Sequence, residues 1–198
     1  MFANLLKIIG ILVTLYLISA FIAKSNYKVE RKSIINAPQK LVYNQVGILR
    51  NWDSWSPWVE RDPSVQNTYE GKDGEKASIM KWVGDKDLTG TGQIEITEAD
   101  PPNGLNYKLT FKVPFEMSSK GTFLLSAVDP GKTNITWSDE GDIPFLMRPM
   151  MMFMDMDKQI GPDFERGLVK LDSITAGMHL QILLMMAQDS SKQNTILN

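Results

Sequence analysis

The chain of 198 residues is 43% apolar and 22% charged, and its formal net charge is −2. This length and composition favour one sizeable folded domain with appendages and exclude wholesale disorder. The folded part has no long basic block, which argues against nucleic acid as a partner because phosphate binding needs a concentrated cationic surface. The chain has no cysteine, and this excludes disulfides, thiolate catalysis and cysteine-based zinc sites.

The N-terminal segment predicts a membrane anchor. Residues 8–23 carry no charge, and the apolar run extends back through residues 2–6 with only Lys7 intervening. About 20 apolar residues span a bilayer, and a lysine near one end can snorkel to the interface. A cleaved signal peptide and a core helix are the alternatives, but Phe21 interrupts a small-x-small cleavage site and the segment lacks a polar face. We therefore assign residues 1–24 to an N-terminal transmembrane helix.

Basic residues flank this helix unequally. Lys24, Lys28, Arg31 and Lys32 follow it, whereas Lys7 and the terminal amine precede it. The positive-inside rule favours a single-pass membrane protein whose folded domain is cytoplasmic. Arg31 and Lys32 fall within the first predicted strand, so the charge difference is small, and the same cations could rest on anionic headgroups.

Residues 25–176 are predicted to form one domain that begins with a strand over 26–35 and a helix over 37–49. A segment with three tryptophans, Trp52, Trp55 and Trp58, follows. From there to about Gly141 the pattern is strand-like and is interrupted by glycine- and proline-containing turns, which predicts an antiparallel meander. In the clearest strand, 105–113, apolar residues occupy every second position: Leu105, Tyr107, Leu109, Phe111 and Val113.

After Asp142 the apolar period changes to that of a long helix. We expect Gly161-Pro162 to kink or restart this helix. An antiparallel sheet with helices gathered on one face is an α+β layout. Residues 177–198 form a C-terminal tail for which the sequence supports no structural prediction. The helical stripe consists of Phe153, Ile160, Phe164, Leu168 and Leu171.

Several segments together are characteristic of one protein family. They are Val29-Glu30-Arg31 to Ile35, Asn36-Ala37-Pro38, Leu49 to Trp58, Asn134-Ile135-Thr136-Trp137-Ser138, Glu140-Gly141-Asp142 and Gly161-Pro162-Asp163-Phe164-Glu165-Arg166-Gly167-Leu168. In this order they closely resemble the SRPBCC superfamily. Within it, the chain resembles the polyketide cyclase/dehydrase and lipid-transport group in its membrane-anchored bacterial form, over residues 25–175.

The resemblance implies a helix-grip, or START-like, fold. In that fold a curved antiparallel sheet wraps around a long C-terminal helix and encloses a hydrophobic cavity. The resemblance does not imply one activity, because the superfamily includes lipid carriers, hormone receptors, aromatase/cyclases and chaperone activators. Function must therefore be argued from the site.

No metal site, nucleotide site or cofactor is predicted. The one histidine, His179, lies in the tail and is interpreted as a surface residue. The carboxylates Asp139, Glu140 and Asp142 cluster near a strand end, where such a run is usually a solvated turn. Gly90-Thr91-Gly92 lacks the further glycine and the following helix of a dinucleotide-binding motif.

Asp139 has two interpretations. Counting by two from Ile135 and Trp137 points it to the inner face of the sheet, where an unpaired carboxylate is costly. We therefore expect the strand to end or bulge there, so that Asp139 reaches solvent. The alternative is a cavity acid with a raised pKa that hydrogen-bonds the ligand or donates a proton.

Two clusters of large apolar residues also have two interpretations each. We expect Trp52 and Trp55 to fill the gap between short helices and sheet, and Trp58 to lie at the cavity entrance, with headgroup-level placement as an alternative. The methionines at the start of the terminal helix fit either loose core packing or a pliable pocket or lid. They are Met147, Met150, Met151, Met152, Met154 and Met156.

These patterns favour a carrier or binding module for a lipid-like or other hydrophobic small molecule. An enzyme of the cyclase or dehydratase type is the alternative, with Asp139, Tyr107 and Arg148 as its polar candidates. A chaperone-activator-like interaction domain is a third possibility, and the sequence predicts no oligomeric state. The expected ligand-binding residues are Trp58, Met80, Trp82, Tyr107, Leu109, Phe111, Phe123, Leu125, Trp137, Phe145, Met150, Phe153 and Met154.

Overall fold

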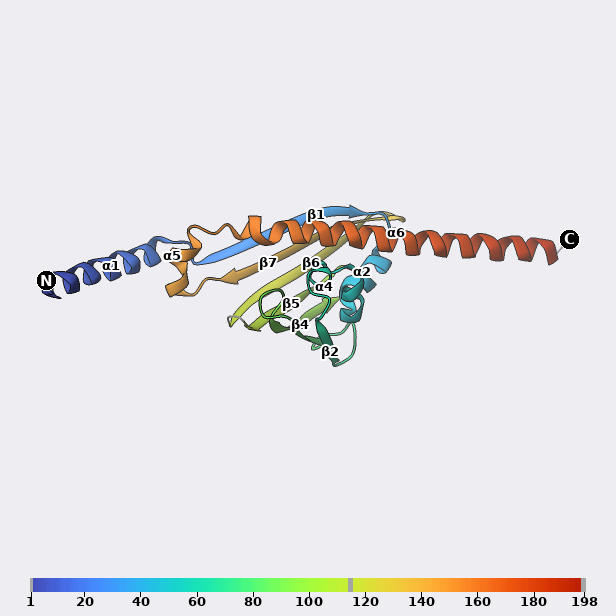
Figure 1. Ribbon diagram of the computed structural model, residues 1–198. Coiled ribbons are helices and arrows are strands. Elements are labelled where there is room, and N and C mark those ends of the chain that lie inside the picture. The colour runs from blue at the N-terminus through green and yellow to red at the C-terminus, as the bar shows by residue number, and fades with distance from the viewer. Residues whose placement is uncertain (1, 114–115, 197–198) are drawn as a thin grey trace.

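The computed structural model describes residues 2–113 and 116–196, with side chains up to residue 192 (Figure 1). The helices are α1 (Phe2–Ile22), α2 (Gln39–Gly47), α3 (Trp52–Trp55), α4 (Pro57–Arg61), α5 (Arg148–Met151) and α6 (Met156–Ile196). Two short 3-10 helices are η1 (Leu49–Asn51) and η2 (Phe145–Met147). The strands are β1 (Asn26–Ile35), β2 (Gln66–Glu70), β3 (Ile79–Val83), β4 (Thr91–Asp100), β5 (Gly104–Val113), β6 (Met117–Asp129) and β7 (Lys132–Asp142).

The seven strands form one sheet in the order β1-β7-β6-β5-β4-β3-β2. Every neighbouring pair is antiparallel, and β2 to β7 follow one another as the predicted meander. The sheet curves, and α6 runs along β1 and across its inner face (Figure 1). The predicted α+β helix-grip architecture, a curved antiparallel sheet around a long C-terminal helix preceded by an N-terminal apolar helix, is confirmed.

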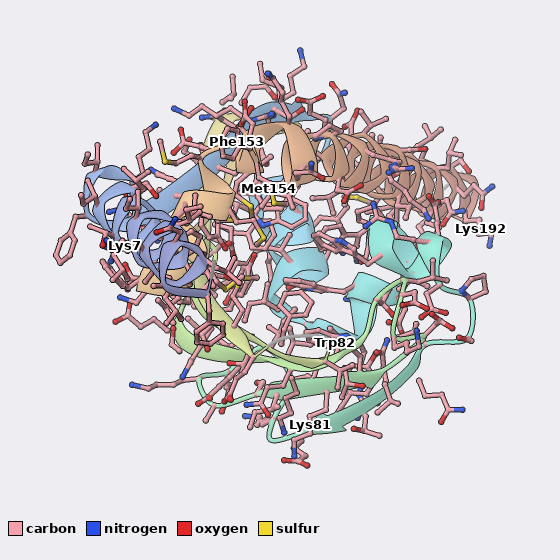
Figure 2. All side chains as sticks on the ribbon, turned by 60° about the vertical axis from the view of Figure 1, so that its left-hand side comes forward. Lys7, Lys81, Trp82, Phe153, Met154 and Lys192 are labelled. Atoms are coloured by element: carbon pink, nitrogen blue, oxygen red, sulfur yellow. The ribbon has the colours of Figure 1, made fainter. Side chains whose placement is uncertain are left out.

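Alternation along the strands decides which side chains reach the core. Trp82 points to the inner face of β3, whereas its neighbour Lys81 points outward (Figure 2). In β6, Phe123 and Leu125 are buried while Leu124 between them is exposed. A period of two places the apolar set of each strand on one face, as predicted for Leu105 to Phe111 and the weaker counterparts. Val113 was expected on the same face but is exposed, because a register shift against Thr91 and Gly92 of β4 precedes it.

The short helices α2 and α3 close one half of the sheet. Trp52 and Trp55 are buried there, and their indole N–H groups donate to the carbonyl oxygens of Val46 and Gln45 at 2.8 and 3.1 Å. Trp55 also contacts Trp137 edge-on, with ring centroids 5.5 Å apart. Both tryptophans therefore fill the gap between helices and sheet, as predicted, with their polar atoms satisfied.

Helix α6 buries its apolar stripe and continues without interruption. Phe164, Leu168 and Leu171 are buried against the sheet. The restart expected at Gly161-Pro162 is wrong, because Pro162 lies inside one continuous helix. The carbonyl of Lys158, which loses its donor at Pro162, belongs to an exposed residue where water can replace the bond.

The described part of the C-terminal tail, residues 177–196, belongs to the same helix. Helix α6 extends past the sheet, at the opposite end of the domain from α1 (Figure 1). Several large apolar side chains of this extension are exposed, among them Leu180, Leu184 and Met186. By length and composition, two of the described helices could cross a bilayer, α1 and the Met156–Lys192 part of α6. The first half of α6 is the core helix of the domain.

Candidate functional site: a cavity between the sheet and the start of α6

A cavity of about 350 Å³ lies between the inner face of the sheet, α4 and the first turns of α6. This volume falls within the range of small-molecule sites, roughly 300–1,000 Å³. Its lining residues are Tyr27, Trp52, Ser56, Trp58, Val59, Arg61, Val65, Met80, Trp82, Leu88, Thr89, Ile94, Tyr107, Leu109, Phe111, Met117, Ser119, Asp139, Met156, Gln159, Ile160, Asp163 and Phe164.

The cavity occupies the half of the sheet that α2 and α3 leave uncovered. Its sheet lining comes from the start of β1, β4 and β6 and from β3, β5 and β7, which the antiparallel register brings together. Arg61, Leu88 and Gln159 are the exposed members of the lining. They place the mouth between α4, the β3–β4 loop and the start of α6.

Glycines opposite aromatic residues make room for the cavity. Tyr107 pairs across the strands with Gly121, and Trp82 pairs with Gly92. A Cβ atom on Gly121 would lie 1.8 Å from Cζ of Tyr107, and one on Gly92 would lie 2.4 Å from Trp82. Each ring therefore lies down over its glycine instead of standing up from the sheet, which leaves space above it.

Asp139 is a buried acid of the cavity. It is 3% exposed, and its carboxylate accepts hydrogen bonds from the hydroxyls of Ser119 at 2.9 Å and Tyr27 at 3.1 Å. The expected exposure to solvent is wrong, because β7 continues in register to Asp142 with no bulge at Asp139. Burial raises the pKa of Asp139 to about 6, although the two hydrogen bonds act in the opposite direction.

Tyr107 joins the cavity to the core. Its hydroxyl oxygen accepts a hydrogen bond from the indole N–H of Trp137 at 2.9 Å. The ring of Trp137 stacks on Phe164 of α6 with centroids 4.0 Å apart and an interplanar angle of 2°. Burial, with the charge of Asp139 as a second cause, raises the pKa of Tyr107. Tyr107 is therefore a neutral phenol held in one position.

The rim is held by buried carboxylates that the sequence analysis did not identify. Asp163 lines the cavity and binds Arg61 through both carboxylate oxygens at 2.8 Å, and Arg166 at 2.8 Å. Asp62 accepts hydrogen bonds from Thr89 and from the backbone N–H of Asp85 in the β3–β4 loop. Hydrogen bonds from Ser64 and Thr89 lower the pKa of Asp62 to about 2. No local motif identifies these aspartates, because Arg61 lies 102 residues from Asp163, and Thr89 and Asp85 lie 27 and 23 residues from Asp62.

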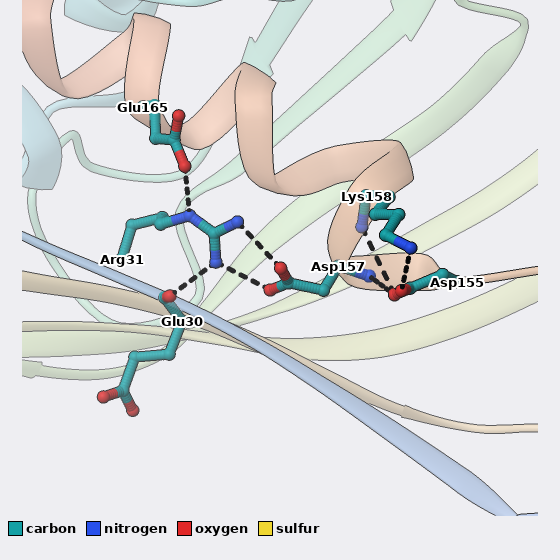
Figure 3. Close-up of polar contacts among 6 residues, drawn as sticks. All are labelled: Glu30, Arg31, Asp155, Asp157, Lys158 and Glu165. Atoms are coloured by element: carbon teal, nitrogen blue, oxygen red, sulfur yellow. Dashed lines mark hydrogen bonds and ion pairs between the residues drawn. The ribbon is translucent and has the colours of Figure 1, made fainter.

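Arg31 fixes the start of α6 to β1 (Figure 3). Its guanidinium donates to both carboxylate oxygens of Asp157 at 2.6 and 2.9 Å and to Glu165 at 2.6 Å. This contact lowers the pKa of Asp157. A Cβ on Gly161 would lie 2.0 Å from the guanidinium, so the glycine lets Arg31 lie against the helix. Arg31 thereby positions the helix turns that form part of the cavity rim.

The structure brings together about half of the expected ligand-binding residues. Tyr27, Ser119, Gln159 and Asp163 were not expected in the lining, although Tyr27 shares the inward phase of Val29. Met156, at the start of α6, lines the cavity and is the one described methionine of its cluster that does so. The expected residues that do line the cavity are Trp58, Met80, Trp82, Tyr107, Leu109 and Phe111, together with the candidate acid Asp139.

The other expected residues lie outside the cavity. Phe123, Leu125 and Trp137 point inward but fill the core next to α3 and α6. Phe145 and Met150 lie outside because η2 and α5 pack against α1 instead of under α6, and Phe153 and Met154 are exposed after α5. Arg148 also lies outside, and its Nε–H donates to the carbonyl oxygen of Ile143 at 3.1 Å. Among the described residues, no group of three or more His, Cys, Asp and Glu side chains could hold a metal ion.

Comparisons with known proteins agree with this geometry. The family model described as polyketide cyclase / dehydrase and lipid transport matches residues 27–174, while a search of curated proteins finds no match. The chain is similar to the structure of the Aha1 dimer from Colwellia psychrerythraea, with 14% identity, a TM-score of 0.55 and coverage of 76% of this chain and 96% of that chain.

Two further solved structures are similar at the same level. The Zhui aromatase/cyclase from Streptomyces sp. R1128 has 14% identity and a TM-score of 0.54, with coverage of 76% of this chain and 93% of that chain. The di-domain ARO/CYC BexL of the BE-7585A biosynthetic pathway has 15% identity and a TM-score of 0.56, with coverage of 74% and 45%. At such identities these likenesses show the fold, whereas the family model spans most of the chain. The chain belongs to the polyketide cyclase/dehydrase and lipid-transport family.

Proposed function

We propose that this protein is a membrane-anchored binding protein that holds a hydrophobic small molecule or lipid in its internal cavity. The observation that carries the proposal is the cavity of about 350 Å³, roofed by the start of α6 and lined mainly by aromatic and aliphatic side chains. Removing apolar ligand surface from water releases about 25 cal/mol per Å², which suffices for micromolar binding without a charged partner.

A membrane tether fits this function because it keeps the cavity beside a reservoir of apolar molecules. Helix α1 has 21 residues, and at about 1.5 Å per residue it is about 32 Å long, close to the bilayer core of about 30 Å. Its large side chains are exposed, as expected for a helix whose solvent is lipid. Lys7 lies within reach of one end, where its charge can snorkel to the interface.

The test is photo-cross-linking of the full chain in lipid nanodiscs with a fatty acid that carries a diazirine. The wild-type protein should give cross-links on lining residues such as Leu109 and Ile160. Leu109→Trp fills the cavity and should abolish them. Leu124→Trp makes the same change on the exposed outer face of the sheet and should leave them intact. Cross-links that never map to the cavity in wild-type protein would contradict the proposal.

A cyclase- or dehydratase-type enzyme is the second candidate, and Asp139 is the observation that favours it. A buried acid with a pKa of about 6 inside an apolar cavity is suited to proton transfer. Tyr27 and Tyr107 line the same space. Asp139→Asn should abolish turnover of a polyketide-like substrate in an enzyme, whereas a binding protein should retain its cross-linked ligand.

A further inference from the structure

The cavity and the apolar helix α1 lie at the same end of the domain. Strand β1 begins at Asn26, four residues after α1 ends at Ile22, and Tyr27 at its start lines the cavity. The register places Tyr27 opposite Gly141 and Asp139 opposite Gly121. The open half of the sheet is thus the half from which α1 emerges.

The segment 144–155 links β7 to α6 at this end and packs on α1. The ring of Phe145 contacts Phe21 edge-on, with centroids 4.9 Å apart and an interplanar angle of 70°. The hydroxyl of Tyr16 donates a hydrogen bond to the carbonyl oxygen of Leu146. These two contacts place η2 beside the last turns of α1.

The same segment exposes an unusual amount of apolar surface. Phe153 is 91% exposed, and it lies beside the start of α6 on the side from which α1 emerges (Figure 2). Leu88, on the rim of the cavity in the β3–β4 loop, is a separate exposed apolar residue at the same end of the sheet. Arg148 lies over the ring of Phe145, at 5.6 Å from its centroid, and supplies a cation next to the apolar cluster. The exposed apolar residues of the segment are Leu146, Met150, Met152, Phe153 and Met154.

The position of the segment along α1 sets its depth in a bilayer. From Tyr16 to Ile22 the helix rises by about 9 Å. If α1 spans the bilayer, Phe145 and Leu146 therefore lie within about 9 Å of the end of the span, whereas interfacial elements bury their apolar faces by about 5–10 Å. At this depth the segment is next to lipid, so we expect lipid, and not a second copy of the chain, to cover its apolar side chains.

We infer that the segment 144–155 is a second membrane contact, which rests the cavity mouth on the bilayer so that the ligand passes directly between the cavity and the leaflet beside it. The inference depends on the proposed membrane anchor and names the ligand class as a bilayer-resident apolar molecule. Helix α6 leaves the domain at the other end, so its exposed extension does not take part (Figure 1).

Because the chain has no cysteine, single cysteines can be labelled cleanly for a test of position. The full-length Phe153→Cys variant is labelled with an environment-sensitive fluorophore and placed in nanodiscs of phosphatidylcholine and phosphatidylglycerol. We expect blue-shifted emission and quenching by spin-labelled lipids. Val128→Cys is the matched control, since Val128 is exposed near the β6–β7 turn at the far end, and it should remain unquenched. Equal, water-like fluorescence at positions 153 and 128 would overturn the inference. It would also be overturned if the fluorophore at position 153 were not quenched by lipid and the unlabelled Phe153→Cys variant formed disulfide-linked dimers, because a second copy of the chain would then cover the segment.

A second experiment tests passage of the ligand. The double variant Met150→Ser and Phe153→Ser keeps α1 and the cavity and should slow cross-linking of a diazirine fatty acid supplied from vesicles by on the order of tenfold, with the same final yield. An unchanged rate would overturn direct passage. Loss of cavity cross-linking in wild-type protein would instead contradict the proposed function, while quenching at Phe153→Cys could still succeed.

Discussion

Tyr107 lies across Gly121, its cross-strand partner, so closely that a Cβ on the glycine would come within 1.8 Å of the phenol ring. The same relationship joins Trp82 to Gly92. In each pair the absent side chain lets the ring lie against the sheet. The cavity thus depends on glycines as much as on the aromatic residues that line it.

Gly121→Ala should displace the ring of Tyr107 and destabilise the protein by about 1–3 kcal/mol, because overpacking forces a buried side chain off its rotamer. Gly177→Ala is the matched control. Nothing lies within 4 Å of its added Cβ, and its position in α6 predicts a gain of about 0.5–1 kcal/mol. Urea unfolding of both variants measures the difference. If the two variants changed the free energy of unfolding equally, the position of the Tyr107 ring would not depend on the missing side chain of Gly121.

Tyr107→Phe should destabilise the protein by about 1–3 kcal/mol, because it leaves the indole N–H of the buried Trp137 without its acceptor. Tyr69→Phe should cost less, because the hydroxyl of Tyr69 donates to Asp53 at an exposed site. Thermal unfolding gives both values. If Tyr107→Phe still cross-links the diazirine fatty acid, the hydroxyl of Tyr107 has a structural role. A Tyr107→Phe variant as stable as wild type would show that the hydrogen bond contributes nothing to stability.

The stability of the protein should fall as pH rises through about 6, because ionised Asp139 is poorly solvated. Burial raises its folded pKa from the ordinary 3.8 to about 6, so its favourable contribution is complete below 3.8 and lost above 6. The difference between those pKa values corresponds to about 3 kcal/mol.

Asp139→Asn should remove this dependence and be more stable than wild type at about pH 8. Denaturant unfolding of both proteins at about pH 4, 6 and 8 measures how the free energy of unfolding depends on pH. Glu140→Gln, at an exposed neighbouring position, should reduce the pH dependence only slightly, because the charge of Glu140 is the smallest of the causes that shift the pKa of Asp139. An Asp139→Asn variant that is less stable at high pH would mean that the hydrogen bonds from Tyr27 and Ser119 outweigh the cost of burial.

Arg31→Lys should loosen the first turns of α6, because an ammonium cannot replace the guanidinium that bridges Asp157 and Glu165. We expect faster amide hydrogen exchange over residues 156–162. The effect should shrink in high salt, since these ion pairs are partly exposed and screened. Lys32→Arg, an equally conservative change at an exposed neighbour, should leave exchange in α6 unchanged. If amide exchange over residues 156–162 were the same in Arg31→Lys as in Lys32→Arg, Arg31 would not position the start of α6.

The sequence determined the architecture and the faces of its strands. Alternation along 105–113 identified β5 and its inward side chains as far as Phe111, and the helical stripe identified the buried residues Phe164, Leu168 and Leu171. Period-two and period-3.6 patterns are local, so they can be read without knowing what covers each face. Such patterns say which way a side chain points. They do not say how far along the strand the core is filled.

Only the tertiary structure decided where the interior is packed and where it is open. Phe123 and Tyr107 both point inward, yet the two tryptophans of α3 fill the space above Phe123, whereas Tyr107 faces the cavity. Asp139 remains inside because Tyr27 and Ser119, distant in sequence, supply its hydrogen bonds. Phe153 has the helical phase of a core residue but precedes α6 and is exposed. These outcomes depend on contacts between distant segments, and the free energy of burying a polar group is set by the partners that such contacts provide.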